Sequence, residues 1–205
     1  MIIQNFIVFE GGDGSGTTTQ LNLLQDRLTN FPLYATFEPT DGHIGRLIRS
    51  ALKREISLHA ESLAHLFVAD RNEHLFAPSG IVERAGANEL VVSDRYVLSS
   101  LVYQGITCGN ELAFTLNERF PFPEALFFFD VDPEIALERV EKRAEKEIYE
   151  YLDFQKLVRS SYKALLTWYE EKGVRVVVLD ASQPLVVVAE DVWRNLKNLP
   201  ILEAV

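Results

Sequence analysis

Five short apolar runs recur along the chain, and longer segments separate them. The runs are continuous rather than alternating, which is typical of strands that are buried on both faces of a sheet. They comprise FIVF (6–9), YATF (34–37), LVVS (90–93), ALFFFD (125–130) and VRVVVLD (174–180). We therefore predict five strands of a parallel sheet.

The segments between these runs have apolar residues at spacings of three and four, as helices do. They comprise residues 18–28, 58–77, 133–142 and 149–172, and a final helix is expected to begin near Pro184. Alternation of strand and helix predicts an α/β fold of three layers, in which a parallel five-stranded sheet has helices on both faces. Ligands of such sheets bind beyond the carboxyl ends of the strands, and polar motifs follow most of the runs there.

Nothing in the sequence divides the chain into separate units. We find no internal repeat, low-complexity tract or Gly/Ser linker, and residues 105–110 are interpreted as a loop inside a domain. The 205 residues, of which 47% are hydrophobic and 24% charged, suffice for one buried core. The prediction is a single domain that spans residues 1–205.

Charge and cysteine content restrict the partners and the compartment. A formal net charge of −10 argues against a protein that binds nucleic acid through a broad basic face. Cys108 is the only cysteine, so an internal disulfide is excluded and a reducing compartment is expected. The first ten residues lack a basic leader, and no stretch has the length of a membrane span. We expect a cytoplasmic protein without membrane or nucleic-acid partners.

A glycine-rich segment, GGDGSGTT, follows the first run directly. It matches the phosphate-binding pattern Gly-x-x-x-x-Gly-Lys-Ser/Thr except that Thr17 stands in the place of the lysine. Consecutive backbone amides and the start of the next helix favour a bound phosphate, and the Thr18 hydroxyl can bind Mg²⁺. The alternative is a glycine-rich turn without a ligand, but the strand before and the helix after favour the phosphate loop. Its residues are Gly11, Gly12, Asp13, Gly14, Ser15, Gly16, Thr17 and Thr18.

A second polar motif, Asp94-Arg95, follows the third run. An acid at a strand end can hold the hydration shell of Mg²⁺, and an adjacent arginine can bind an acceptor phosphate through two hydrogen bonds. Thr18 and Asp94 are therefore the candidate metal ligands, and Arg95 is the candidate phosphate ligand.

Several blocks of the sequence, in the same order, resemble the thymidylate kinase family, and the resemblance extends over nearly the whole chain. FEGGDGSGTTTQ (9–20) resembles FEGxDGxGKSTQ, and TFEPTDGHIGRLIR (36–49) resembles TREPxGxxxGxxIR, with Phe37 in place of an arginine. SDRYVLSSLVYQG (93–105) resembles DRYxxSxxAYQG, and LFVADRNEH (66–74) resembles the segment that binds thymine. The resemblance implies a nucleoside monophosphate kinase of the P-loop type that uses ATP.

The resemblance also implies where dTMP binds. Phe67 would stack on thymine, Arg71 would contact the base, and Tyr103 would lie beside the deoxyribose. The full set is Asp13, Glu38, Phe67, Arg71, Arg95, Ser100, Tyr103 and Gln104. Asp13 would orient the 3′-hydroxyl or the metal shell.

The residues alone leave other readings open for the helix 58–77. Phe67 could be a core residue, and Asp70-Arg71 could be a solvated ion pair worth about 0–1 kcal/mol. His74 is expected to be structural rather than catalytic.

The segment at about 139–152 is rich in charge. Its cations have spacings of three and four, which places Arg139, Lys142, Arg143 and Lys146 on one helical face. Composition alone would describe a solvated, salt-bridged helix. The resemblance implies instead a mobile lid over ATP, with Arg143 against adenine and Lys146 as the catalytic cation. A lysine lacks the planar fork of the arginine that is common there.

The function that the resemblance implies is phosphoryl transfer from ATP to dTMP, with Mg²⁺, by a homodimer. Arg95, Lys146 and Asp13 are the expected catalytic residues. Three family cations are altered, at Thr17, Phe37 and Lys146. Two alternatives therefore stay open: a nucleotide-binding pseudo-kinase, and a kinase of another nucleotide or of a deoxynucleoside. A regulatory GTPase is disfavoured because no Asn-Lys-x-Asp motif is recognisable.

Overall fold

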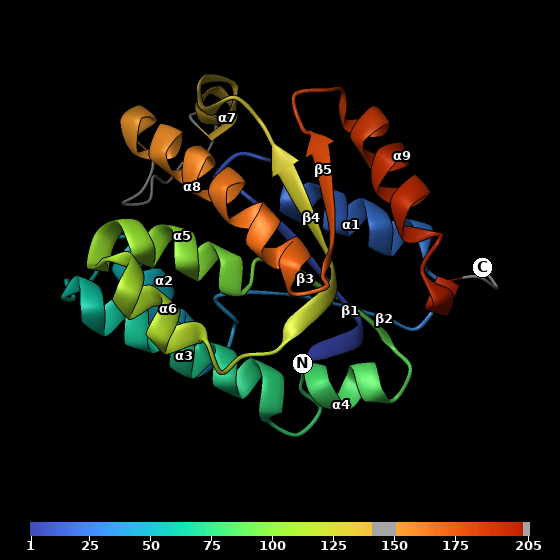
Figure 1. The fold of residues 1–205 in the computed structure, drawn as a ribbon, viewed down its shortest axis with the longest axis horizontal. Helices are drawn as coiled ribbons and strands as arrows, with labels where there is room; N and C mark the ends of the chain where they lie inside the picture. Colours follow the sequence, from blue (N-terminus) through green and yellow to red (C-terminus); the bar gives the residue numbers. More distant parts are fainter. Residues whose placement is uncertain (141–150, 203–205) are drawn as a thin grey trace.

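The computed structural model describes residues 1–140 and 151–202. Its sheet has five parallel strands in the order β2-β3-β1-β4-β5, which confirms the predicted sheet (Figure 1). The strands are β1 (Ile2–Gly11), β2 (Leu33–Phe37), β3 (Leu90–Asp94), β4 (Phe122–Asp130) and β5 (Arg175–Asp180). The helices are α1 (Thr17–Arg27), α2 (His43–Leu52), α3 (Ala60–Phe76), α4 (Ile81–Gly86), α5 (Val97–Cys108), α6 (Asn110–Asn117), α7 (Pro133–Val140), α8 (Leu152–Glu171) and α9 (Leu185–Leu196). A short 3₁₀ turn, η1, spans Pro200–Leu202.

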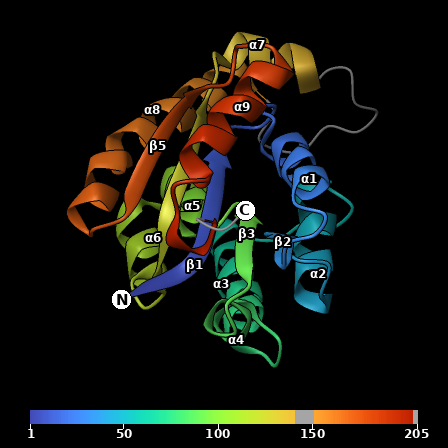
Figure 2. The same cartoon turned by 90° about the vertical axis from the view of Figure 1, so that its right-hand side faces the viewer.

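The sheet separates two hydrophobic cores, because successive side chains of a strand point to opposite faces. On β1, Phe6 and Val8 belong to the core beneath α5, α6 and α8, whereas Ile7 and Phe9 belong to the core beneath α1 and α9. Figures 1 and 2 show these two groups of helices on opposite sides of the sheet. The apolar run of β1 is therefore continuous because the strand is buried on both faces, as predicted.

The register of the strands determines where polar side chains meet. Phe9 of β1 lies opposite Asp94 of β3, so the glycine-rich segment after β1 and the Asp94-Arg95 motif come together at one edge of the sheet. The helices that follow these two strands cover opposite faces, which opens the sheet edge between them to a ligand.

The sequence missed four helices, and one loop prediction was wrong. No helix was predicted for α2, α4, α5 or α6, and residues 105–110 were expected to form a loop. In the structure α5 continues to Cys108, and only Gly109, with φ +93°, separates it from α6. Gly105 lies inside α5, and a Cβ at this position would stand 2.6 Å from Asn110 Oδ1 of α6. The glycine serves the close approach of two helices rather than a turn.

No helix in the described part of the chain combines the length and the apolar character that crossing a membrane requires.

Candidate active site

The glycine-rich segment forms a phosphate loop between β1 and α1. Gly14 and Gly16 have φ of +80° and +92°, which favours glycine, and a Cβ on Gly14 would lie 2.3 Å from the Ala136 carbonyl oxygen. Gly16 is the N-cap of α1 and has no side chain that could cap the first amides of that helix. These amides are therefore available to an anion, although Thr17 offers no ammonium group beside them.

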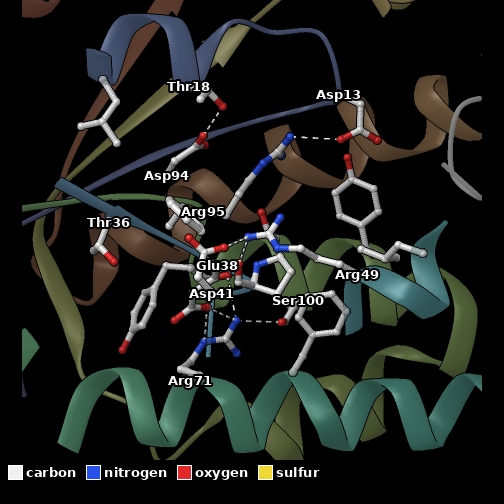
Figure 3. A pocket seen from close by; sticks show the side chains of 18 of the residues that line it. Asp13, Thr18, Thr36, Glu38, Asp41, Arg49, Arg71, Asp94, Arg95 and Ser100 are labelled. Carbon is white, nitrogen blue, oxygen red and sulfur yellow. Dashed lines mark hydrogen bonds and ion pairs between the residues drawn. The ribbon is translucent and has the colours of Figure 1, made fainter. Parts of the chain in front are cut away.

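Thr18 and Asp94 meet beside the loop, as Figure 3 shows. The Thr18 hydroxyl donates a hydrogen bond to Asp94 Oδ2. Asp94 Oδ1 is buried and has no hydrogen-bond partner within residues 1–140 and 151–202. A hydroxyl and an available carboxylate oxygen next to a phosphate loop fit Mg²⁺, which takes few protein ligands and keeps waters and substrate phosphates.

A cavity of about 1100 Å³ extends from the loop to α3. This volume slightly exceeds the usual range for small-molecule sites, roughly 300–1000 Å³. All eight residues that were predicted for dTMP line it: Asp13, Glu38, Phe67, Arg71, Arg95, Ser100, Tyr103 and Gln104. The structure therefore brings the predicted set to one place.

Arg95 lies between the phosphate loop and the rest of the cavity. Its guanidinium donates to the Gly12 carbonyl oxygen at 3.2 Å, to Asp13 Oδ1 at 3.1 Å and to the Tyr162 hydroxyl at 3.0 Å. Burial opposes the charge, but the neighbouring oxygens of Tyr162, Tyr103 and Asp13 raise the pKa of Arg95 well above its usual value. Arg95 is a fixed cation with an orientation set by three acceptors.

Arg71 is buried, which shows that the solvated-pair reading was wrong. The guanidinium lies 2.8 Å from Glu38 Oε2, and it donates to Ser100 Oγ at 2.9 Å and to Asn117 Oδ1. The neighbouring Asp70 is also buried and accepts from the Thr40 amide and hydroxyl instead of pairing with Arg71. Both side chains have their partners on other elements, so their adjacency in sequence is incidental.

Glu38 lines the cavity next to Arg71 and His74. Burial raises the pKa of its carboxyl, but Arg71 and His74 together hold that pKa below its ordinary value. His74 contacts Glu38 Oε1 at 3.1 Å through Nδ1 and Thr36 Oγ1 at 2.6 Å through Nε2. The expectation of a structural His74 agrees with these contacts.

The other dTMP candidates surround the far part of the cavity. Phe67 packs against the small core of α2 and α3 and also lines the cavity, so stacking of its ring on thymine stays a prediction. Gln104 Oε1 is buried without a hydrogen-bond partner among the described residues. The Tyr103 ring lies 5.9 Å below the Arg95 guanidinium.

Arg49 of α2 was missed. It lines the cavity, its guanidinium stands 5.1 Å above the Phe37 ring, and its Nε is buried without a partner among the described residues. The block 36–49 ends in this arginine, so the motif itself contained the signal. Arg49 thus supplies a cation beside the position where Phe37 replaces the family arginine.

Part of the lid prediction lies outside the described residues. Lys142, Arg143 and Lys146 are in that part. Arg139, at the end of α7, donates to the carbonyl oxygens of Gly14 and Ala181, at 3.4 and 3.0 Å. The start of the segment is therefore attached to the phosphate loop and to the turn after β5.

The fold and the site define a class of enzyme. A parallel sheet with β1 at its centre, a phosphate loop after β1 and an Asp-Arg pair at the end of β3 beside a cavity describe a P-loop nucleoside monophosphate kinase.

Comparison with known proteins gives the family. The thymidylate kinase family model matches residues 9–192. A protein of Treponema pallidum is 39% identical over 201 residues, covering 96% of this chain and 97% of its own. One of Pyrobaculum aerophilum is 40% identical over 197 residues, covering 95% and 97%. Both are named thymidylate kinases, with a qualifier that marks the name as provisional. The chain belongs to the thymidylate kinase family.

Proposed function

We propose that the cavity performs the reaction of the family, transfer of the γ-phosphoryl group of ATP to dTMP, giving ADP and dTDP for dTTP biosynthesis. The observation that supports this is the position of Arg95, a fixed cation between the phosphate loop and the pocket of Phe67, Arg71 and Gln104. An acceptor phosphate on Arg95 would face the loop, and its nucleoside would extend toward α3.

The acceptor phosphate is held by two arginines in this proposal. Arg95 offers a planar fork, and Arg49, which donates to the Pro39 carbonyl oxygen, also lines the cavity and has a buried Nε without a partner among the described residues. Asp13 lies 3.1 Å from Arg95 and would orient the 3′-hydroxyl of dTMP or the metal shell. Positioning and charge stabilisation account for most of the catalysis in phosphoryl transfer.

The thymine base is read by buried polar groups and one aromatic ring. Gln104 Oε1, which lacks a partner in the described chain, suits an N–H donor such as N3 of thymine. Arg71, held by Glu38 and Ser100, presents its remaining donor hydrogen to a base oxygen, and Phe67 offers a stacking surface. The Tyr103 ring lines the cavity 5.9 Å from the Arg95 guanidinium, where the deoxyribose would sit.

ATP would place its phosphates on residues 11–18. Thr18 and Asp94 would hold Mg²⁺, which shields phosphate charge when bound. No group of three or more His, Cys, Asp or Glu side chains within the described residues could hold a metal by itself, so nucleotide phosphates and water would complete the shell.

The missing loop lysine is compensated from the lid in this proposal, with Lys146 as the cation and Arg143 against adenine. Lys146→Ala is expected to lower kcat about a hundredfold and to leave the Kd of dTMP within threefold, because the charge acts only during transfer. Steady-state rates and calorimetry measure the two effects.

Thr17→Lys provides the matched test, because it returns an ammonium group to the loop. We expect the double variant Thr17→Lys/Lys146→Ala to have a kcat at least ten times that of Lys146→Ala. An unchanged kcat in Lys146→Ala would remove Lys146 from the mechanism.

The rival function is a nucleotide-binding pseudo-kinase, which the three altered cations favour. Purified protein with ATP and Mg²⁺ is assayed for ADP with dTMP, dUMP, dCMP and UMP in parallel, and with EDTA as the metal-free control. We expect turnover that is fastest with dTMP and abolished by EDTA. Binding of dTMP by thermal shift without turnover of any acceptor would establish the pseudo-kinase instead.

We also propose a homodimer in the cytoplasm. The resemblance implies that two copies pack through helices, and the nucleotide substrates and the single Cys108 suit a reducing compartment. Light scattering that gives the mass of one chain would contradict the dimer.

A further inference from the structure

Glu10, the residue before the phosphate loop, has no part in the mechanism above, yet its side chain is completely buried. Four donors surround the carboxylate. Oε1 accepts from the Tyr96 and Ser99 amides at 2.9 and 3.2 Å. Oε2 accepts from the Ser99 hydroxyl at 2.6 Å and the Tyr162 hydroxyl at 3.1 Å. A buried carboxylate with four donors is organised for a purpose beyond filling the core.

The two amide contacts place Glu10 at the start of α5. Tyr96 is the N-cap of α5, and its own side chain makes no capping hydrogen bond. Ser99 is the third residue of the helix, whose amide an N-cap side chain normally satisfies. Glu10, on β1, thus caps the N-terminus of α5. This helix contains Ser100, Tyr103 and Gln104 of the proposed dTMP pocket.

The contact with Tyr162 extends the network to the acceptor phosphate. The Tyr162 hydroxyl donates to Glu10 and accepts from Arg95 Nη1 at 3.0 Å. Arg95 has φ +76°, a left-handed backbone that is uncommon outside glycine, and its guanidinium is oriented by hydrogen bonds to other residues. Glu10 and Tyr162 supply one of these contacts, and Asp13 supplies another.

We propose that Glu10 is a positioning residue for dTMP: through the Tyr162 hydroxyl it orients Arg95, and through the Tyr96 and Ser99 amides it holds the start of α5. The inference rests on the proposed function of the cavity as an acceptor site. Glu10 itself does not touch substrate.

Protonation of Glu10 would change this network. Burial raises the pKa of Glu10 to about 7, although the charge of Arg95 and the hydrogen bonds of Ser99 and Tyr162 oppose the rise. The charge of Glu10 also acts on Tyr169 of α8, and both Glu10 and Asp13 raise the pKa of Tyr162. Since Oε1 faces two N–H donors, a proton must sit on Oε2, and a hydroxyl that donated to Oε2 must turn away. Arg95 then loses the full carboxylate charge behind Tyr162.

Glu10→Gln tests the proposal, because glutamine keeps the shape and the acceptor for the two amides but removes the charge. Tyr162→Phe removes the link to Arg95, and Tyr169→Phe is the matched control for loss of a hydroxyl on the same helix. At pH 8 we expect Glu10→Gln and Tyr162→Phe each to raise KM for dTMP about tenfold, with KM for ATP within twofold. Tyr169→Phe is expected to leave both constants unchanged.

The pH profile separates positioning from a purely structural role. The ratio of kcat/KM for dTMP between wild type and Glu10→Gln should fall from about ten at pH 8 to below about three at pH 6, because wild-type Glu10 is then itself neutral. Ionisation of dTMP affects both proteins equally and cancels in the ratio. The double variant Glu10→Gln/Tyr162→Phe should have the kcat/KM of the less active single variant, since both substitutions break the same link from Glu10 through the Tyr162 hydroxyl to Arg95.

A ratio that stays constant from pH 6 to pH 8, or a double variant in which the two effects multiply, would overturn the proposal. If Glu10→Gln does not fold, Tyr162→Phe with its Tyr169→Phe control gives the same decision from KM for dTMP. If wild type does not turn over dTMP, the proposed function fails; the Kd of dTMP from calorimetry, in the same variants and at the same pH values, then still decides the role of Glu10.

Discussion

Replacing Arg95 by alanine is expected to lower kcat/KM for dTMP by about a thousandfold, because a partly buried charge pair is worth roughly 2–5 kcal/mol when one partner is removed. The side chain of Arg95 is 17% exposed and that of its partner Asp13 is 23% exposed, so solvent screens the charge interactions of Arg95 weakly. Removal leaves an acceptor phosphate without its fork and Asp13 without its cation. Initial rates at dTMP concentrations well below KM measure the loss directly.

Two further variants show whether the fork or the charge matters. Arg95→Lys keeps a cation but cannot bind a phosphate through two parallel hydrogen bonds, so we expect a loss of about thirtyfold, between wild type and alanine. Arg194→Ala removes a mostly exposed arginine that pairs with Asp191 on the surface, and it should change kcat/KM less than twofold. An Arg95→Ala protein within threefold of wild type would refute the assignment of the acceptor phosphate.

Replacing Arg71 by methionine is expected to lower the free energy of unfolding by about 3–5 kcal/mol. The reason is that the buried carboxylate of Glu38 would lose its arginine partner. Glu38, whose side chain is 3% exposed, would lose the cation 2.8 Å from its Oε2 and keep only His74 beside Oε1. Urea unfolding followed by circular dichroism measures the change.

The partner variant tests this explanation. In Arg71→Met/Glu38→Gln the orphaned charge is absent, so we expect at least half of the lost stability to return. Arg194→Met, which breaks an exposed pair, should cost less than about 1 kcal/mol. Equal losses in the single and double variants would mean that packing between the Tyr96 and Phe120 rings, rather than the ion pair, explains the effect.

Local patterns in the sequence were enough for the sheet and for the phosphate loop. Both depend on short-range rules: burial on both faces produces continuous apolar runs, and a strand-to-helix turn around phosphate requires glycines at fixed spacing. The same rules failed for α5 and α6. Gly105 resembles a turn signal in the sequence, but its reason lies in Asn110 of a helix that packs against it.

The motifs Asp94-Arg95 and 66–74 were placed in one site by resemblance, and the structure brings their side chains to one cavity. The hydrogen-bond partners of these side chains could not be predicted from the sequence. Arg71 and Asp70 look like a pair in sequence, yet Arg71 is held by Glu38 and Asn117, and Asp70 by Thr40. Such partners are 30 to 46 residues away and have no local periodicity that would reveal them.

The sequence by itself determined the α/β alternation, the loop without a lysine and the order of the family motifs, because each is a property of neighbouring residues. Only the tertiary structure decided which charges are paired. It placed Arg49 beside Phe37, and it joined Glu10 to Tyr162, which is 152 residues away. Burial and long-range hydrogen bonds arise when distant elements pack, so no stretch of the chain contains them before it folds.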